Sequence, residues 1–537
     1  MTLPERVDVL IVGSGFAGSL LARGLVEMGL EVLVVDRGRH PRFALGESTT
    51  PLGNLALERL ALRFGWRDVW DLACWGRWRK SHPDLRCGLK RGFSFFAADD
   101  SETRPALIAA SPNDEVADTQ WLRADVDAAL CQRARDAGVV VLEQWEVATL
   151  ELGEPVRACL RPVGDTATHE VRANFLVDGS GAGRLLEGHV GGRQPAPLDT
   201  SLIFGHLRGL PRIDSPPGAP YPPTWSAVHH LLDIGWMYEL RFDDDVTSCG
   251  VIVDRQRRRE LDVGLPETTS GQRPAGFASY LPEASGLRER LRVAEPEGPL
   301  RWLEQVGWRV HPVVGANWAR LPHSVGFIDP MFSTGIAWSL LGVERLLDVL
   351  APDLEGSLRA ARLKAYGDLV DREFDHVAGL LEGARATWSE VDALGWFSMV
   401  YFTAASFAET QQRLEARRGS GLSAGDDDLG WAREAPWAWS GFLGTDDPVL
   451  REALGNARRV ALGSSGSARV RAFERHLPDW IEPRNVAGLA CREKHPWYGV
   501  DLEPLMRHCD RLGLRPEQVE AGLPRLLGEV EFDALCP

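Results

Sequence analysis

The chain has 537 residues, which is enough for three or four domains at roughly 150 residues each and enough to bury a full core. Hydrophobic residues make up 44% and charged residues 25%, which excludes a largely disordered chain. The 76 acidic and 60 basic side chains give a net charge of −16, which disfavours a general nucleic-acid binder or a polybasic membrane-surface protein. We therefore expect its partners to be small molecules or other proteins.

Features of a membrane or secreted protein are not found in the sequence. It has no run of 18 or more apolar residues, and residues 1–7 lead into a strand rather than into the apolar core of a signal peptide. Its eight cysteines form no C-x-x-C pair and no tight cluster with histidine. We expect a cytoplasmic protein with free thiols, no membrane or nucleic-acid contact and no metal.

The N-terminal residues carry a complete βαβ pattern. A β-branched run from Val7 leads into the turn 13–18 (GSGFAG), and a helical stretch and a second apolar strand ending at Asp36 follow. The glycines of this turn allow a tight bend, a close approach of the backbone to a pyrophosphate, and close packing of helix on strand; they are Gly13, Gly15 and Gly18. Asp36 is placed to accept hydrogen bonds from a ribose. The pattern predicts dinucleotide binding, against the alternative of a simple glycine turn between two core elements.

Several later segments indicate how the rest of the chain is organised. Residues 174–183 (NFLVDGSGAG) read as a strand that ends in a second glycine turn and returns the chain to the first sheet. A helix is expected from residue 120 to about 138, and antiparallel strands with apolar alternation from about 200 to 255. Helical periodicity dominates from about 336 onward, as in 337–350 and 358–381.

A family resemblance rests on six motifs in the right order and spacing. They are residues 13–18 (GSGFAG), 40–43 (HPRF), 46–51 (GESTTP), 88–93 (GLKRGF), 326–330 (GFIDP) and 331–335 (MFSTG). Together they resemble the flavin-dependent halogenases, and the fourth and sixth look most like the pyrrole and phenol branch. The resemblance covers roughly residues 5 to 410.

The resemblance implies an α/β fold in which a Rossmann-like FAD-binding domain is interleaved with an antiparallel β-sheet substrate domain. We expect the FAD-binding domain in residues 1–200 and 300–350, the sheet domain in 200–300, and a helical C-terminal region in 351–537. It also implies an oxidoreductase of secondary metabolism whose reduced FAD reacts with dioxygen to give a flavin hydroperoxide. Halide then attacks the distal oxygen, and a lysine captures or orients the resulting hypohalous acid.

Carried over motif by motif, the catalytic lysine is Lys90. The halide site is the backbone at Ser333, Thr334 and Gly335, because bare N–H groups in a turn suit an anion. A partly apolar setting would lower the pKa of Lys90 and make it a better amine nucleophile. The remaining candidate contacts to FAD are Gly13, Gly15, Phe16, Ala17, Gly18, Asp36, Arg37, Arg42, Glu47, Ser48, Arg123, Asp178, Asp329 and Gly335.

One stretch departs from the family pattern. Halogenases usually carry a W-x-W-x-I-P signature on a strand between flavin and substrate, and residues 236–241 (WMYELR) stand in its place. Alternation puts Trp236 and Tyr238 on one face, so an aromatic wall is kept while the second Trp and the Ile-Pro pair are lost. A more open wall would make the protein a hydroxylating monooxygenase. Phe332 replaces the glutamate of the tryptophan-specific branch, which argues against free tryptophan as substrate.

Three functions therefore stay open. The leading one is halogenation of an electron-rich aromatic substrate of the phenol or pyrrole kind, either free or tethered to a carrier protein. The others are hydroxylation on the same fold and a flavin-binding partner protein without turnover. No second dinucleotide fingerprint is evident, so we expect a separate flavin reductase to deliver reduced FAD. The histidines have no spacing that favours catalysis, and we expect them to be structural.

Overall fold

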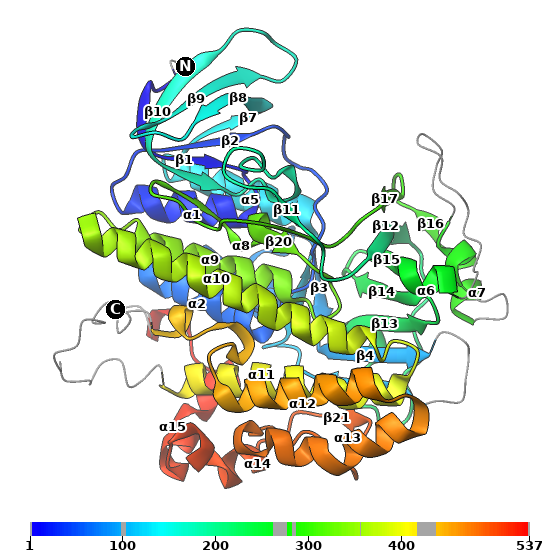
Figure 1. Ribbon diagram of the computed structural model, residues 1–537. Coiled ribbons are helices and arrows are strands. Elements are labelled where there is room, and N and C mark those ends of the chain that lie inside the picture. Colours follow the sequence, from blue (N-terminus) through cyan, green and yellow to red (C-terminus); the bar gives the residue numbers. More distant parts are fainter. Residues whose placement is uncertain are drawn as a thin grey trace.

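The computed structural model describes residues 3–97, 104–260, 276–281, 286–354, 356–415 and 436–534. Two large sheets and a helical region make up the molecule (Figure 1). Among the helices of these described ranges, none is long and apolar enough to cross a membrane.

The first sheet is built on the predicted βαβ unit. Its strand order is β7-β2-β1-β10-β9-β8, and β19 pairs with β10. The central strands β2, β1, β10 and β19 run parallel, and buried Val, Leu and Ile residues fill them because helices cover the sheet. The strands are β1 (Arg6–Val12), β2 (Val32–Asp36), β7 (Val140–Glu143), β8 (Trp145–Glu151), β9 (Val156–Pro162), β10 (His169–Asp178) and β19 (Trp318–Arg320).

Helices pack the first sheet against the rest of the protein. Helix α1 (Phe16–Glu27) packs on α5 (Arg123–Asp136) and on α9 (Thr334–Val349), and α9 also contacts α2 (Pro51–Phe64). Residues Gln120 and Trp121, predicted as the start of α5, belong instead to strand β6 (Asp118–Trp121). They pair there with β3 (Cys87–Lys90), a partner that helical periodicity in one segment does not reveal.

The second sheet has nine strands and is mostly antiparallel. Its order is β16-β12-β15-β14-β13-β4-β5-β21, and β17 pairs with β12. The strands are β4 (Gly92–Ala97), β5 (Ala106–Ala109), β12 (Thr200–Arg208), β13 (Ala227–Leu232), β14 (Gly235–Arg241), β15 (Val246–Asp254), β16 (Glu295–Pro296), β17 (Arg301–Leu303) and β21 (Trp497–Tyr498). The sheet therefore extends beyond the 200–300 boundaries expected for it, because strands from both earlier and later segments add to its edge.

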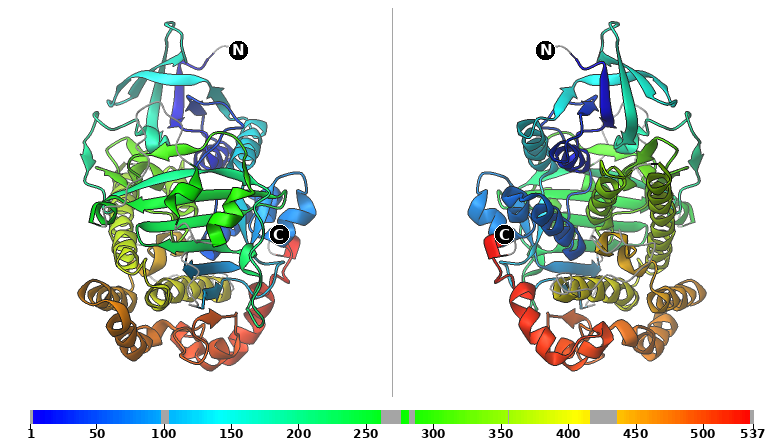
Figure 2. Two further views of the ribbon diagram at one scale, coloured as in Figure 1. Left: turned by 90° about the vertical axis from the view of Figure 1, so that its right-hand side faces the viewer. Right: turned by 90° about the vertical axis from the view of Figure 1, so that its left-hand side faces the viewer.

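From α9 onward the described part of the chain is mostly helical, as expected from its periodicity. Figure 2 shows α12 to α15, in orange and red, gathered at the end of the molecule away from the first sheet. The long helices are α10 (Gly356–Arg385), α11 (Val391–Glu415), α12 (Pro448–Gly463) and α13 (Gly466–Ile481); α14 (Glu503–Arg507) and α15 (Pro516–Leu526) follow. Short elements elsewhere are α3 (Arg67–Asp71), α4 (Trp75–Ser81), α6 (Arg255–Glu260), α7 (Gly286–Arg292), α8 (Pro322–Val325), β11 (Arg193–Gln194), β18 (Trp308–Val310) and β20 (Gly326–Phe327).

The predicted fold class is confirmed. A Rossmann-like parallel sheet, an interleaved antiparallel sheet and a helical C-terminal region are all present. The second glycine turn also lies where it was expected, because β10 runs parallel to β1 and ends beside it. Both glycine turns thus meet at the carboxyl edge of the first sheet, which is the edge at which α/β folds bind ligands.

Candidate cofactor and active site

A cavity of about 410 Å³ begins at the two glycine turns and reaches the second sheet. Its lining comes from the turns after β1 and β10, the loop 42–48, strands β13 and β14, and the N-terminus of α9. The predicted residues that line it are Gly15, Phe16, Ala17, Arg42, Glu47, Ser48, Arg123, Trp236, Tyr238, Asp329, Ser333, Thr334 and Gly335. Residues from widely separated motifs are therefore brought to one place.

The first glycine turn is shaped by close backbone contacts. A Cβ on Gly13 would lie 2.2 Å from the carbonyl oxygen of Gly179, and one on Gly18 would lie 2.0 Å from the oxygen of Gly13. Gly15 differs, because its nearest neighbour would be a side-chain oxygen of Asp127 at 3.6 Å. Gly13 and Gly18 thus serve packing and do not line the cavity, whereas Gly15 leaves its edge open to a ligand.

Asp36 ends β2 as predicted and is already held by several donors. Its Oδ2 accepts hydrogen bonds from the backbone N–H and hydroxyl of Ser14, both at 2.8 Å, and from Arg42 at 2.6 Å, while Gly38 donates to Oδ1. Burial raises the pKa of Asp36, but the Arg42 charge and these donors outweigh it and lower the pKa overall. Asp36 therefore remains ionised at the expected ribose end, although it does not line the cavity. The neighbouring Arg37 is exposed.

Asp178 lies beneath the second glycine turn. Its Oδ1 accepts from the backbone N–H of Ser180 at 3.0 Å and from the Ser180 hydroxyl at 2.6 Å. Arg320 lies 3.7 Å from its other oxygen, and both side chains are fully buried. Gly179 to Gly183 line the cavity in its place. Asp178 therefore stabilises the second glycine turn through these hydrogen bonds.

Arg123, the first residue of α5, ties the loop 42–48 to that helix. Its guanidinium donates to the carbonyl oxygens of Leu45 and Gly46 at 3.1 and 2.9 Å, and it forms a two-bond pair with Asp127 at 2.8 Å. It also lies 4.7 Å from the centre of the Phe16 ring. A clamp of this kind fixes where the loop can approach a ligand.

Two polar residues of this loop face the cavity. Glu47 is buried and its carboxylate lies 2.9 Å from Nε2 of His206. The hydroxyl oxygen of Ser48 is buried without a protein partner. An orphaned hydroxyl in a cavity lining is the kind of group that a bound ligand satisfies. The Ser48 hydroxyl and the open edge of Gly15 both fit a dinucleotide such as FAD.

The opposite end of the cavity is the N-terminus of α9. Ser333 adopts a left-handed conformation with φ of +53°, which turns the chain into the helix and directs its first free N–H groups outward. A Cβ on Gly335 would meet nothing within 4 Å. Free N–H groups and the positive end of a 16-residue helix favour an anion here. The predicted halide site thus has suitable backbone geometry.

Asp329 stands beside this helix and is nearly fully buried. Its Oδ1 accepts from the backbone N–H of Met331 at 2.9 Å, and the indole of Trp236 donates to Oδ2 at 3.4 Å. Burial raises the pKa of Asp329 to about 7 against these two hydrogen bonds. This carboxyl group therefore changes its charge near neutral pH.

The wall facing the helix comes from the second sheet. Trp236, Tyr238 and Leu240 all line the cavity, so the alternation of β14 places them on one face. The Tyr238 ring lies over Gly250, where a Cβ would come within 2.4 Å of it. The wall is therefore aromatic and closely packed even though the second Trp of the halogenase signature is missing.

His229 is a wall residue that sequence reasoning treated as structural. It is fully buried, stacks on Phe95 with ring centroids 4.8 Å apart, and lies 5.0 Å from the Trp236 ring. Its Nε2 lies 2.8 Å from the carbonyl oxygen of Met331. Burial lowers the pKa of His229 to about 4 and keeps the ring neutral. Only the pairing of β13 with β14 and β4 brings it to the cavity, so no local signal could have found it.

Lys90 lies behind the cavity rather than in its lining. Its side chain is completely buried, and its Nζ donates to the carbonyl oxygen of Thr49 at 2.5 Å, one residue beyond the cavity-lining Ser48. The ammonium lies 4.1 Å from the centre of the Phe93 ring. Burial lowers the pKa of Lys90, although the charge of Asp118 opposes the shift. The apolar setting expected for a reactive amine is present.

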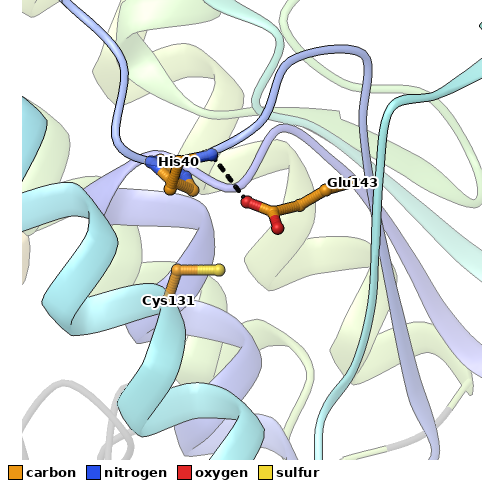
Figure 3. A group of neighbouring side chains, drawn as sticks. All are labelled: His40, Cys131 and Glu143. Atoms are coloured by element: carbon orange, nitrogen blue, oxygen red, sulfur yellow. Dashed lines mark hydrogen bonds between the residues drawn. The ribbon is translucent and has the colours of Figure 1, made fainter.

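One group of potential metal ligands lies near the Asp36 end. Atoms of His40, Cys131 and Glu143 come within 4.8 Å of one another (Figure 3). The Glu143 carboxylate already accepts from the His40 backbone N–H at 2.8 Å and pairs with Arg135 at 3.0 Å. Burial raises the pKa of the Cys131 thiol and so disfavours the thiolate that binds metals. The contacts of this cluster are therefore those of a structural group.

Comparison with known proteins agrees with this geometry. Residues 8–129 match the family described as FAD dependent oxidoreductase. The match covers the first βαβ unit and its glycine turn, so this part of the chain resembles the FAD-dependent oxidoreductases.

Within that class, the relatives are halogenases. The chain is 27% identical over 352 residues to tetracycline 7-halogenase of Kitasatospora aureofaciens, covering 62% of this chain and 60% of that protein. It is 26% identical to a 1H-pyrrole-2-carbonyl-[peptidyl-carrier protein] brominase of Pseudoalteromonas luteoviolacea, covering 68% of this chain and 82% of that one. The chain thus spans less than two thirds of the first relative's length. These similarities confirm the resemblance to flavin-dependent halogenases.

Solved structures share the fold. The halogenase PltM, in complex with phloroglucinol and FAD, superposes with a TM-score of 0.76 over 92% of this chain and 99% of that one, at 20% identity. The flavin-dependent brominase Bmp2 superposes with a TM-score of 0.55 over 89% of this chain, also at 20% identity. The PltM superposition covers most of the helical C-terminal region as well, which the sequence motifs did not reach.

Proposed function

We propose that this protein is an FAD-dependent halogenase that acts on an electron-rich aromatic substrate. The observation that carries the proposal is the single cavity that joins two glycine turns to the N-terminus of α9, with the amine of Lys90 buried directly behind its wall. A dinucleotide and an anion would thus share one cavity, with an amine behind its wall.

Different residues along this cavity would bind the cofactor, the halide and the oxidant. The glycine turns, the clamp at Arg123 and the hydroxyl of Ser48 would hold FAD. When bound and reduced, FAD would supply, with dioxygen, the two-electron oxidant that converts a halide into hypohalous acid. The first N–H groups of α9, at Thr334 and Gly335, would hold the halide. Lys90 would receive the oxidant as a neutral amine, because burial disfavours its charged form.

The finer parts of the proposal concern substrate and partners. Because relatives include a brominase that acts on a carrier-bound pyrrole and a structure that holds phloroglucinol, we propose a phenol or pyrrole substrate, free or tethered to a carrier protein. A separate flavin reductase would supply reduced FAD. The seven described cysteines are unpaired, which suits a reducing cytoplasmic location.

Product mass tests this function. Purified protein would be incubated with FAD, a flavin reductase, NADH, dioxygen and a panel of phenols and pyrroles, with chloride or bromide present or absent. A halide-dependent gain in mass with the isotope pattern of chlorine or bromine is the expected result. A gain of one oxygen regardless of halide would contradict it and would mean that residues 236–241 mark a monooxygenase.

Lys90→Met tests the role of the buried amine. The variant keeps an apolar chain of similar length in the site, so we expect at least about a 100-fold loss of halogenated product while flavin reoxidation continues. Product mass and the rate of flavin reoxidation would be measured together. Lys80→Met is the matched control, since Lys80 is an exposed lysine of α4 and its loss should change neither rate. Full halogenation by the Lys90 variant would refute the assignment.

A further inference from the structure

A buried carboxyl group faces Lys90 across a two-stranded sheet. Strands β3 and β6 run antiparallel, and Lys90 and Asp118 stand directly opposite each other in their register. Side chains at directly opposed positions leave the same face of a sheet, with Cβ atoms roughly 4.5–5.5 Å apart. Both side chains are buried, at 0% and 1% exposure. The fold therefore encloses two opposite charges side by side.

Neither charge has the partners that its ionised form requires. A protonated lysine has three N–H donors. The Nζ of Lys90 donates to the carbonyl oxygen of Thr49. Asp118 receives a hydrogen bond from the side-chain amide of Asn54 at 2.7 Å on Oδ1, but its Oδ2 is buried without a donor. Buried charges with few partners are costly, so the pair gains when a proton moves from nitrogen to oxygen.

Other charged groups reach this pair from the elements packed around it. On the side of β13, the neutral ring of His229 lies near Lys90. From α11, the carboxyl group of Glu409 raises the pKa of Asp118 and the guanidinium of Arg413 lowers it, while Tyr401 of the same helix senses the charge of Asp118. Glu409 and Arg413 also pair with each other at 2.9 Å. Because their charges are opposite, their effects on the pKa of Asp118 partly cancel.

We propose that Lys90 and Asp118 share one proton, and that Asp118 takes it whenever Lys90 acts as a free amine. In the transfer an Nζ–H bond breaks and an Oδ2–H bond forms, so an ammonium and a carboxylate become an amine and a carboxylic acid. No other reactant is needed, and rotation about the bonds of the flexible lysine stem is the movement that would bring Nζ to Oδ2. Asp118 is thus a positioning residue, and the hydrogen bond from Asn54 to Oδ1 leaves Oδ2 as the oxygen that takes the proton.

The pairing can be measured in the protein without FAD. The sequence contains four lysines, so labelling lysine with ¹³C and ¹⁵N gives four side-chain signals, and that of Lys90 is identified by its loss in Lys90→Met. The signal would be followed with pH in the wild type and in Asp118→Asn, which keeps the shape and can still accept from Asn54. Because the carboxylate supports the ammonium, its removal should lower the pKa of Lys90 by about one unit or more.

Two further variants make the result decisive. Asp84→Asn removes an exposed carboxylate of the loop before β3 and should leave the Lys90 titration unchanged. Asn54→Leu removes the hydrogen bond that stabilises the Asp118 carboxylate, so it should shift Lys90 in the same direction by a smaller amount. It also serves as the test if Asp118→Asn does not fold. An unchanged Lys90 titration in the folded variants would overturn the proposal.

The meaning of this pair for turnover rests on the proposed halogenase function. In Asp118→Asn the acid limb of the halogenation pH profile should move to lower pH by the amount seen in the Lys90 titration, while flavin reoxidation keeps its profile. A merely structural role would lower the rate without moving the limb and would contradict the proposal. Absence of halogenation in the wild type would refute the proposed function alone, because the titration does not depend on it.

Discussion

At the scale of single residues, the site is distinguished by ionisable groups that the fold has removed from water. Asp329 beside the N-terminus of α9 and His229 in the opposite wall each shift toward the neutral form, and burial is the main cause in both. In their neutral forms, these two groups neither repel an anion at the N-terminus of α9 nor compete with it as a fixed charge. His229 is therefore neutral at neutral pH, whereas the charge of Asp329 beside α9 changes with pH in this range.

Asp329→Asn should flatten the pH dependence of stability. The pKa of Asp329 is about 7 in the folded protein and 3.8 ordinarily, so the folded state holds a proton that the unfolded state has lost between these values. The stabilisation that comes from this proton is fully present below pH 4 and is lost as the pH rises to 7. Over this range the free energy of unfolding should fall by about 4 kcal/mol. Urea unfolding of the FAD-free protein from pH 4 to 8 measures it. Parallel curves for wild type and variant would contradict the assignment.

At the scale of elements, the glycines of the first turn have two different roles: two of them allow close packing, and one leaves room for a ligand. Gly13 and Gly18 are needed by the protein itself, because backbone oxygens occupy the space of their missing side chains. Gly15 has no such neighbour. The same motif thus contains positions that hold the strand, helix and second turn together and one that is free for the cofactor.

A pair of valine variants tests this separation. Gly15→Val should fold with near wild-type stability and bind little FAD, because its side chain enters the cavity. Gly18→Val places a Cβ 2.0 Å from a backbone oxygen and should destabilise the protein by about 3 kcal/mol or more. Flavin absorbance after purification and thermal unfolding distinguish the two losses. Normal FAD content in folded Gly15→Val would show that this edge is not the cofactor site.

At the scale of the whole molecule, a buried ion pair joins the site to the C-terminal region. Arg345 of α9 and Glu373 of α10 form two hydrogen bonds of 2.7 Å, and both side chains are fully buried. Glu373 also accepts from the Trp338 indole at 2.8 Å and from the backbone N–H of Phe442 at 2.7 Å. Helix α9, whose N-terminus lines the cavity, is thereby fixed to the segment that leads into α12.

Glu373→Ala should destabilise the protein by about 3–5 kcal/mol, because it leaves the Arg345 guanidinium buried without its carboxylate. Asp368→Ala is the matched control, since it breaks an exposed pair with Lys364 on the same helix and should change the free energy of unfolding by less than about 0.5 kcal/mol. Denaturant unfolding at pH 7 measures both. A loss from Glu373→Ala as small as that of the control would refute the linking role.

The sequence by itself determined those features that depend on interactions between residues close together in the chain. The turn at residues 13–18 needs its glycines because backbone oxygens crowd it, and alternation alone placed Trp236 and Tyr238 on one face. The resemblance of ordered motifs then pointed to FAD and to Lys90. Each of these inferences depends on residues that lie within a few positions of each other or on the order of motifs along the chain.

The tertiary structure decided which of these residues meet and in what state. Asp36 and Asp178 proved to be engaged with protein donors, Lys90 lies behind the cavity lining, and His229 lies within it. Asp118 faces Lys90 only because β6 pairs with β3, a contact between strands that carry no matching local signal. Pairing between strands far apart in the sequence determines which side chains are buried, and burial shifts their pKa values. The charge states of the site residues could therefore be inferred only from the folded chain.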